Sequence, residues 1–469
     1  MNIILAAVLY LIAILISVQM LMQGMNRKVE FFSLRNFFLV GLIVYQVINV
    51  ARILVTETTL PFFPLQDMIG TGAKYIVALV LFLIIFNVIY MRGRQKQLER
   101  DAGRVTVLHV GVGAMLTLSV LFVVIGLVLR FTYMYTGPVA QLVDLIGLGL
   151  LAVAAGLAGW AWMSHFWNII AAVVSLAVLA AALSSEIGSF GRRDLLGIAA
   201  AFLFGAYHGA WKHYKPSRAL LYIAVSGACG FLLLSAHTAV RVAFQSQISF
   251  SRIIEKLLGA DLGKGAADAA SGQDAGAISL WLMETRGNGV VDYDFLHSFR
   301  VLTTFWIPRS LWEGKPIGLA LTIPQQAGID KVAAEFNVGP GLIGHFWNDN
   351  PYIALPLYSI LIAFAFRWLD NTIRRNPNNP FVVLPMGAAL GQFIGLARGE
   401  LGTFAFRAIV YMATSWVALQ VLYRLFASMG LRMTVETYYL PPAGADENES
   451  AGVDGTYDPQ AASEYAKAG

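Results

Sequence analysis

The chain has 469 residues, of which 57% are hydrophobic and 13% charged, and its mean hydropathy is +0.65. This composition excludes an ordinary soluble globule, whose apolar share is about 45 to 50%. The formal net charge of +5 does not indicate nucleic-acid binding, because the basic residues lie in short loops between apolar runs, where positive charge sets the orientation of membrane insertion. We therefore expect an all-α polytopic membrane protein.

Apolar runs long enough to cross about 30 Å of hydrocarbon follow one another along the chain. The first starts at the N-terminus, which lacks a charged segment and a small-residue cleavage site, so we expect a spanning helix there and not a signal peptide. The pattern predicts about eleven transmembrane helices, with the two termini on opposite sides. The runs begin near Asn2, Asn36, Gly70, Thr106, Ala140, Phe166, Leu195, Ala219, Pro351, Phe381 and Thr403.

Lysine and arginine in the short loops predict the orientation of these helices. Four basic clusters fall on one face of the eleven-helix arrangement, and the positive-inside rule assigns that face to the cytoplasm. The N-terminus is then periplasmic and the C-terminus cytoplasmic. The clusters are Arg27, Lys28 and Arg35; Arg92, Arg94, Lys96, Arg100 and Arg104; Lys212, Lys215 and Arg218; and Arg374 and Arg375.

The order of the runs divides the chain into four segments: helices one to eight in 1–241, a long periplasmic loop in 242–350, helices nine to eleven in 351–430, and an acidic tail in 431–469. Within the loop, 262–277 is rich in Gly, Ala and Asp and is expected to be flexible. The aromatic stretch 281–312 is expected to form short helices that lie at the membrane interface or dip into it. The tail has no apolar periodicity, so we expect it to be disordered and cytoplasmic.

Arginines from separate regions gather on the predicted periplasmic face. Arginine in or beside spanning segments costs a few kcal/mol, so several at one level suggest a shared purpose. Its planar fork holds two phosphate oxygens and stays charged, which suits a diphosphate, although each residue alone is also explained as a snorkelling anchor. The candidates are Arg192, Arg193, Arg241, Arg300, Arg309 and Arg398, joined by Lys315, with Arg52 and Arg407 as secondary candidates.

A glycine-punctuated segment before the ninth run supplies candidate acid–base residues. His345 and Asp349 are four residues apart and share a face if the segment is helical, so that the carboxylate could orient or activate the imidazole. The alternative is that His345 and Trp347 anchor the helix at the headgroup level. Other carboxylates near this face are also able to accept a proton, and the sequence does not choose among them. These are Glu186, Asp292, Asp294, Glu313, Glu335 and Glu400.

Some motifs are absent from the sequence. It has no phosphate-binding Walker loop, no dinucleotide-binding glycine motif and no His, Cys and carboxylate cluster with metal-ligand spacing. It also lacks an evident internal repeat, which argues against a transporter built from inverted halves. An ATP-driven pump and a metalloenzyme are therefore disfavoured, and we expect neither cofactor nor metal.

Short motifs between Gly188 and Glu400 carry a family resemblance. They are Gly191-Arg192-Arg193, Ile307-Pro308-Arg309 with Lys315-Pro316, the glycines Gly341 and Gly344, and Arg398-Gly399-Glu400. In a multispan chain with a long late loop, this set resembles the Wzy-type O-antigen and exopolysaccharide repeat-unit polymerases. Many members of that family have Gly-Glu where this chain has Gly344-His345, which leaves the identity of the base open.

The resemblance implies a GT-C-like membrane glycosyltransferase in the bacterial inner membrane. Its donor is a growing glycan on undecaprenyl diphosphate, its acceptor is a lipid-linked repeat unit, and a chain-length regulator is a possible partner. The alternatives are an O-antigen ligase that transfers glycan to the lipid A core, a flippase or other transporter for lipid-linked oligosaccharide, and a structural subunit of a secretion complex.

Overall fold

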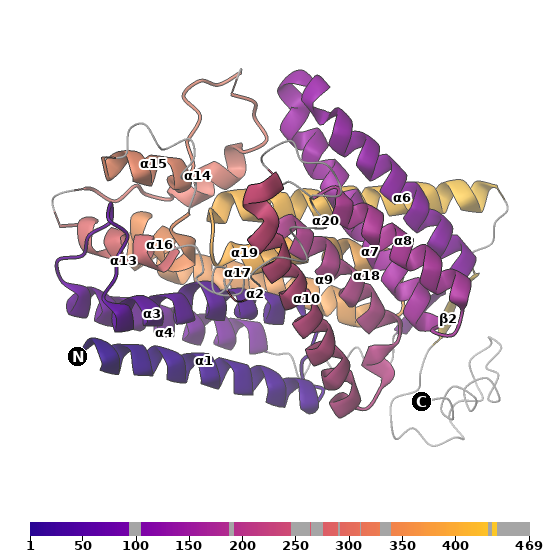
Figure 1. The fold of residues 1–469 in the computed structure, drawn as a ribbon, viewed down its shortest axis with the longest axis horizontal. Coiled ribbons are helices and arrows are strands. Elements are labelled where there is room, and N and C mark those ends of the chain that lie inside the picture. Colours follow the sequence, from indigo (N-terminus) through magenta and orange to yellow (C-terminus); the bar gives the residue numbers. More distant parts are fainter. Residues whose placement is uncertain are drawn as a thin grey trace.

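The computed structural model is almost entirely helical (Figure 1). It describes residues 1–92, 105–186, 192–244, 263, 275–288, 291–309, 311–328, 339–429 and 434–438. Each of the eleven apolar runs contains a helix, and seven of the described helices are long and apolar enough to cross a membrane. The chain is therefore an all-α protein with the helices of a multi-pass membrane protein. The number of crossings stays a prediction.

The seven candidate spans come from both halves of the chain. They are α1 (Asn2–Met25), α2 (Leu34–Leu42) continued by the π-helical turn η1 (Ile43–Ile48) and α3 (Asn49–Thr56), α4 (Met68–Met91), α6 (Val112–Thr132), α7 (Ala140–Ser164), α17 (Pro351–Arg375) and α20 (Leu401–Ser428). The other runs form α8 (Ile169–Ser184), α9 (Arg192–Gly209), α10 (Pro216–Phe244), α18 (Pro380–Ala388) and α19 (Leu390–Leu396).

The fourth run begins later than the sequence predicts. Residues Val105–His109 form a strand, β1, which pairs antiparallel with β2 (Thr434–Tyr438), and helix α6 starts only at Val112. The β-branched residues of Val105-Thr106-Val107 favour the extended backbone. Sequence patterning also missed β2, which falls in the segment expected to be disordered. The rest of 431–469 lies outside the described residues.

The tenth run is broken into two short helices. Helix α18 ends at Ala388, and the single residue Ala389 separates it from the start of α19 at Leu390. Gly391 in α19 packs so closely on α9 that an added Cβ would lie 2.7 Å from the Cα of Gly197. This contact holds α19 beside the start of α9. The turn 397–400 that follows α19 is thereby placed at the same end of the bundle as the first turn of α9.

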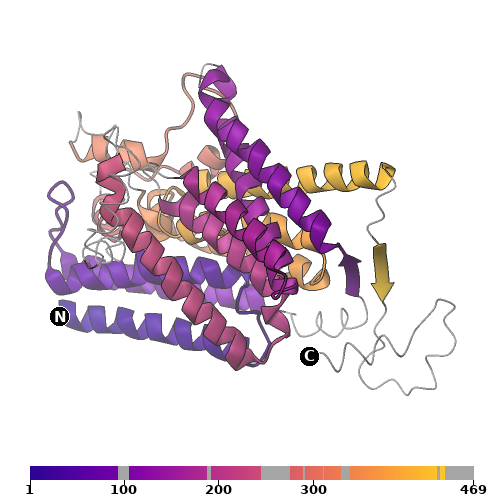
Figure 2. The ribbon, with the colours of Figure 1, turned by 45° about the vertical axis from the view of Figure 1, so that its right-hand side comes forward.

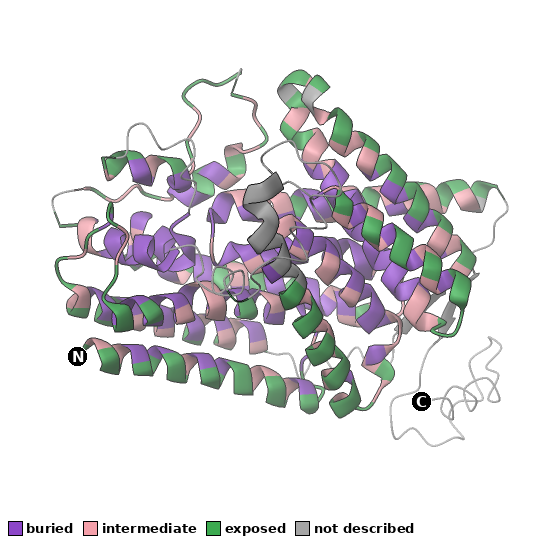
Figure 3. Ribbon diagram, viewed as in Figure 1, coloured by how far each residue is buried: buried purple, intermediate pink, exposed green. Residues whose placement is uncertain are grey.

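Helix α7 lies at the centre of a group of packed helices (Figure 3). Its residues 147–161 are all buried, and it packs against α6, α8, α9, α18 and α20. Small residues permit this: a Cβ on Gly159 would lie 2.2 Å from the carbonyl oxygen of Phe202, and one on Gly205 2.0 Å from that of Gly156. Because glycine has no side chain, the backbones of α7 and α9 approach closely where the helices cross, as is common between membrane helices.

Four short helices of the long loop gather at one end of the bundle, where the N-terminus also lies (Figure 1). They are α13 (Ala275–Thr285), α14 (His297–Thr304), α15 (Leu319–Gln326) and α16 (Gly341–Asn348). Helix α13, whose last five residues begin the aromatic stretch 281–312, is buried among α3, α4 and α16, and the position of the stretch relative to a membrane stays a prediction. Most of the segment 262–277, expected to be flexible, lies outside the described residues.

The opposite end brings the basic loops together. Lys212 donates to the side-chain oxygen of Asn378 at 2.9 Å, and Arg27 donates to the carbonyl of Tyr214 at 3.4 Å. Deeper in the same end, Asp370 accepts from the backbone N–H of Leu34 at 2.8 Å. Loops from three of the four predicted basic clusters thus meet at one end. The fourth cluster, beyond Arg92, lies outside the described residues.

Candidate functional site

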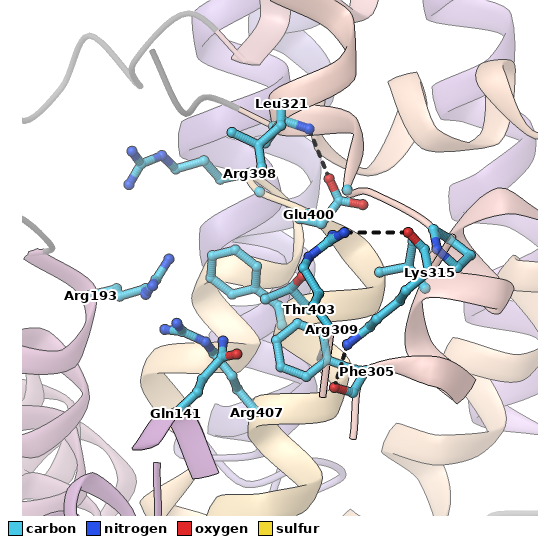
Figure 4. A pocket seen from close by; sticks show the side chains of 17 residues that line it. Gln141, Arg193, Phe305, Arg309, Lys315, Leu321, Arg398, Glu400, Thr403 and Arg407 are labelled. Carbon is cyan, nitrogen blue, oxygen red and sulfur yellow. Dashed lines mark hydrogen bonds between the residues drawn. The ribbon is translucent and has the colours of Figure 1, made fainter. Parts of the chain in front are cut away.

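A cavity of about 320 Å³ opens at the end of the bundle that carries the loop helices (Figure 4). It lies between the first turns of α7, α9 and α20 and the loop segments 301–321 and 339. Its size falls within the range of small-molecule sites, about 300 to 1,000 Å³. Its charged lining consists of Arg193, Arg309, Lys315, Arg398, Glu400 and Arg407.

Each cation enters from the start of a helix or from a turn. Arg193 lies in the first turn of α9, Arg398 in the turn between α19 and α20, and Arg407 in the second turn of α20. Arg309 and Lys315 come from the loop between α14 and α15. Figure 4 shows the five side chains around one space. The fold thus brings together four of the seven predicted diphosphate ligands, Arg193, Arg309, Lys315 and Arg398, with Arg407 from the secondary candidates.

An aromatic ring supports the cations on the α9 side. The guanidinium of Arg193 lies 4.9 Å from the ring centre of Phe404, and Arg193 Nε is 3.5 Å from a carboxylate oxygen of Asp194. The ring is itself fixed by a close approach, because an added Cβ on Gly399 would lie 2.0 Å from it. Cation–π contact and the neighbouring carboxylate together hold Arg193 at the cavity wall.

Backbone carbonyls support the cations on the loop side. The ammonium of Lys315 donates to the carbonyls of Phe305 and Ile307, both at 2.8 Å, and Arg309 donates to the carbonyl of Lys315 at 3.5 Å. Burial, and then the charge of Arg309, lower the pKa of Lys315. The two cations therefore fold the Ile-Pro-Arg to Lys-Pro segment into a loop that presents both charges to the same cavity.

Glu400 is the one carboxylate in the charged lining given above. It is 6% exposed, and burial raises its pKa to about 8. One carboxylate oxygen accepts from the backbone N–H of Ala320 at 3.0 Å, and the other, Oε1, has no hydrogen-bond partner among the described residues. An ionisable oxygen beside a cavity, without a partner and with a pKa close to neutral, is suited to proton transfer.

His345 and Asp349 lie behind the cavity wall and do not line the cavity. Both are fully buried, and both bond to Ser298: His345 Nδ1 meets its hydroxyl at 2.7 Å, and Asp349 accepts from its backbone N–H at 2.7 Å. His345 Nε2 accepts from the backbone N–H of Leu401 at 3.1 Å, and Asp349 also accepts from the hydroxyl of Tyr358 at 2.7 Å.

These hydrogen bonds fix the tautomer of His345. Because Nε2 of His345 accepts a hydrogen bond, the proton of its neutral ring is on Nδ1, which donates to Ser298. Burial lowers the pKa of His345 to about 3, and burial raises the pKa of Asp349. The network ties α14, α16 and the start of α20 together next to Glu400. A catalytic role for the pair stays a prediction, and the positions of these side chains favour a supporting role.

The remaining predicted arginines lie elsewhere or outside the described side chains. Arg300 is exposed on α14 and pairs with Asp294. Arg192 begins α9 and Arg241 lies in α10, but their side chains are not among those the structure describes. Arg52 is exposed on α3. Neither Arg300 nor Arg52 is in the lining of the described cavity.

Sequence reasoning ranked Arg407 too low and did not include Gln141. Arg407 follows Glu400 by seven residues and Phe404 by three, so the three side chains share one face at the start of α20. That spacing was visible in the sequence and would have joined Arg407 to the Arg398-Gly399-Glu400 motif. Gln141, which also lines the cavity, carried no such signal.

No group of three or more His, Cys, Asp or Glu side chains among the described residues is arranged to hold a metal ion. Comparison of the chain with protein-family models, with curated proteins and with solved structures finds no match. What the fold defines is a multi-pass helical membrane protein with a cationic cavity at one end. Its function has to be argued from that cavity.

Proposed function

We propose that the protein is a membrane glycosyltransferase that lengthens a polysaccharide from a polyprenyl-diphosphate donor. The observation that carries the proposal is the convergence of Arg193, Arg309, Lys315, Arg398 and Arg407 on one cavity. A described lining with five cations and one carboxylate favours an anion of high charge density as the ligand. A diphosphate fits this requirement and the size of the cavity.

The proposed reaction explains why the cations are useful beyond binding. As the anomeric carbon of the donor glycan parts from the diphosphate, negative charge grows on the leaving oxygens. A guanidinium group held in place by a ring contact, such as that of Arg193, stabilises that charge without rearrangement, and it does so more strongly in a water-poor site than in bulk water. The leaving group then needs neither a metal ion nor a nucleotide carrier.

Glu400 is our candidate for the general base. The acceptor hydroxyl attacks the anomeric carbon and must lose its proton, and Glu400 is the carboxylate in the described lining of the cavity that can receive it. With a pKa of about 8, a fraction of the carboxylate is ionised at neutral pH, and the proton, once taken, is held firmly. His345 then acts through its bond to Leu401, the residue after Glu400, by fixing the turn.

The resemblance of the 307–316 segment to Wzy-type polymerases supports repeat-unit polymerisation over ligation to the lipid A core. The placement of the cations disfavours a flippase, because a transported anion requires charges along a path through the bilayer. Among the described residues, the five cavity cations are confined to one end of the bundle. The finer proposals are eleven crossings, a GT-C-like arrangement, an inner-membrane location with a periplasmic N-terminus, and a chain-length regulator as partner.

Gel analysis of surface glycan tests this proposal. A strain that lacks the gene is complemented with the wild-type chain or with Arg309→Ala, and surface glycan and lipid-linked glycan are separated by size. Loss of the polymerase leaves single-repeat products. Long glycan that stays on the polyprenyl carrier and never reaches the core indicates a ligase, and single repeats that stay accessible only from the cytoplasm indicate a flippase.

A further inference from the structure

A second cavity lies at the opposite end of the bundle from Glu400. It has a volume of about 270 Å³ and is formed where the end of α1, the end of α9 and the start of α10 meet the 377–378 turn. Figures 1 and 2 both show the end of α1 beside the start of α10. Its charged lining is Arg27, Glu30, Lys212 and His213. Nothing in the proposed reaction uses this cavity.

Arg27 occupies a backbone position that normally favours glycine. Helix α1 ends in a Schellman motif, in which the N–H of Arg27 bonds to the carbonyl of Gly24 at 3.0 Å and the N–H of Lys28 bonds to that of Gln23 at 2.9 Å. This geometry puts Arg27 in the left-handed region, at φ +51°. Arginine is disfavoured there, and residues kept in such positions gather at ligand sites. The side chain of Arg27 lines the cavity and donates to the carbonyl of Tyr214 at 3.4 Å.

Lys212 is the second cation of this cavity. Its ammonium donates to Asn378 at 2.9 Å and to the carbonyl of Pro377, two neutral acceptors that aim it without neutralising it. Burial lowers its pKa to about 8, and burial together with Lys212 and Arg27 lowers the pKa of His213 to about 4. The carboxylate of Glu30 is bonded to the hydroxyl of Tyr207, and its charge partly opposes the effect of burial on the pKa of Lys212, so it supplies one negative charge against the cations Arg27 and Lys212. The positive charge of the cavity is therefore only partly balanced.

The surroundings add positive charge at the rim. Lys28, Lys215 and Arg218 are exposed immediately beside the cavity residues in sequence. Basic pockets between membrane helices, at the end where such loops cluster, bind phosphate-bearing lipid headgroups. Guanidinium and ammonium groups are also the side chains that hold phosphate oxygens with strong, charge-assisted bonds.

We propose that this second cavity binds a phosphate group, with Arg27 and Lys212 as its main ligands. An anionic phospholipid headgroup and a soluble phosphate compound both supply that chemistry. The site is separate from the Glu400 cavity, so a failure here leaves the proposed reaction untouched.

Thermal unfolding of the purified full chain in neutral detergent tests the site. We add phosphatidylglycerol, phosphatidylcholine or inorganic phosphate to equal concentration. The expected result is a rise in Tm with phosphatidylglycerol and none with phosphatidylcholine, which identifies a lipid headgroup. A comparable rise with inorganic phosphate supports the same site with a soluble ligand. No rise with either anion overturns the proposal.

Arg27→Gly is the decisive variant, because glycine suits the left-handed position. Without added lipid its Tm should equal or exceed that of the wild type, so a loss of binding is not a loss of folding. The rise in Tm caused by the anion should disappear in Arg27→Gly. It should persist in Lys28→Gln, which removes the same charge from the neighbouring residue outside the cavity lining. An undiminished rise in Arg27→Gly overturns the assignment of Arg27.

Discussion

His345 Nε2 lies 3.8 Å from Glu400 Oε1, and the two atoms do not share a hydrogen bond. The lone pair of His345 Nε2 accepts the backbone N–H of Leu401, and the ring proton points the other way, toward Ser298. The imidazole therefore positions the turn that carries Glu400 and leaves its Oε1 without a bonded hydrogen. The sequence suggested His345 as the general base. In the structure His345 holds the turn, and we assign the role of base to Glu400.

The pH dependence of glycan transfer should follow Glu400. A base acts in its deprotonated form, so with a pKa of about 8 the rate should rise from about pH 6 through pH 8 and then level off. Glu400→Gln should lower the rate by about 10²- to 10⁴-fold and abolish this rise. Rates are measured as chain extension by purified protein in detergent. A wild-type rate that is flat or falls over this range contradicts the assignment.

Removing one cavity arginine should slow glycan transfer without destabilising the fold. Arg309→Ala should lower the rate by about 10²- to 10³-fold, the usual effect of deleting one group that stabilises developing negative charge. Arg309 is exposed at the cavity and bonds only weakly to Lys315, so membrane insertion and Tm should be unchanged. The matched control is Arg300→Ala, an exposed arginine of the same loop outside the cavity lining. Equal losses of rate in Arg309→Ala and Arg300→Ala would show that the rate depends on the overall charge of the loop and not on the position of Arg309 in the cavity.

His345 and Asp349 should prove to be structural. His345→Ala leaves Ser298 and the N–H of Leu401 without their buried partner, and each unsatisfied group costs about 1 to 3 kcal/mol. We expect a clear fall in Tm, with a pH profile in the surviving folded protein that still rises through about 8. A profile that becomes flat in His345→Ala, with Tm unchanged, would instead make His345 the base.

The contact between Gly339 and the 397–400 turn should be essential for activity. An added Cβ on Gly339 would lie 2.5 Å from the carbonyl carbon of Gly399, which is too close for any side chain. Gly339→Ala should therefore displace the turn, and with it Arg398 and Glu400, and reduce the rate strongly. Gly227→Ala is the control, because a Cβ there meets nothing within 4 Å. Similar activity in the two variants would mean that the turn tolerates displacement.

Sequence patterning was informative about the helices. Runs of apolar residues predict helical segments well, because a membrane helix must be apolar over its whole length. Patterning failed where local preferences change within a run. The β-branched residues at 105–107 gave a strand, and the tenth run is divided at Ala389 into α18 and α19.

The sequence predicted the chemistry of the site but not which residues form it. Arginine and lysine in turns at one predicted face pointed to an anion site, and four of the seven candidates line the cavity. Proximity among segments far apart in the sequence depends on helix packing, which residue spacing does not report. For this reason the sequence could not separate Arg300, on the outer surface, from Arg309, or choose Glu400 over His345.

The most direct test of the central claim is equilibrium binding of undecaprenyl diphosphate to the purified protein, measured by native mass spectrometry beside uncharged undecaprenol. The account predicts binding of the diphosphate, at least tenfold weaker in the double variant Arg309→Ala with Arg398→Ala, and no such difference for undecaprenol. Equal affinity of the wild type and the double variant for the diphosphate would contradict the claim that these cations form its site.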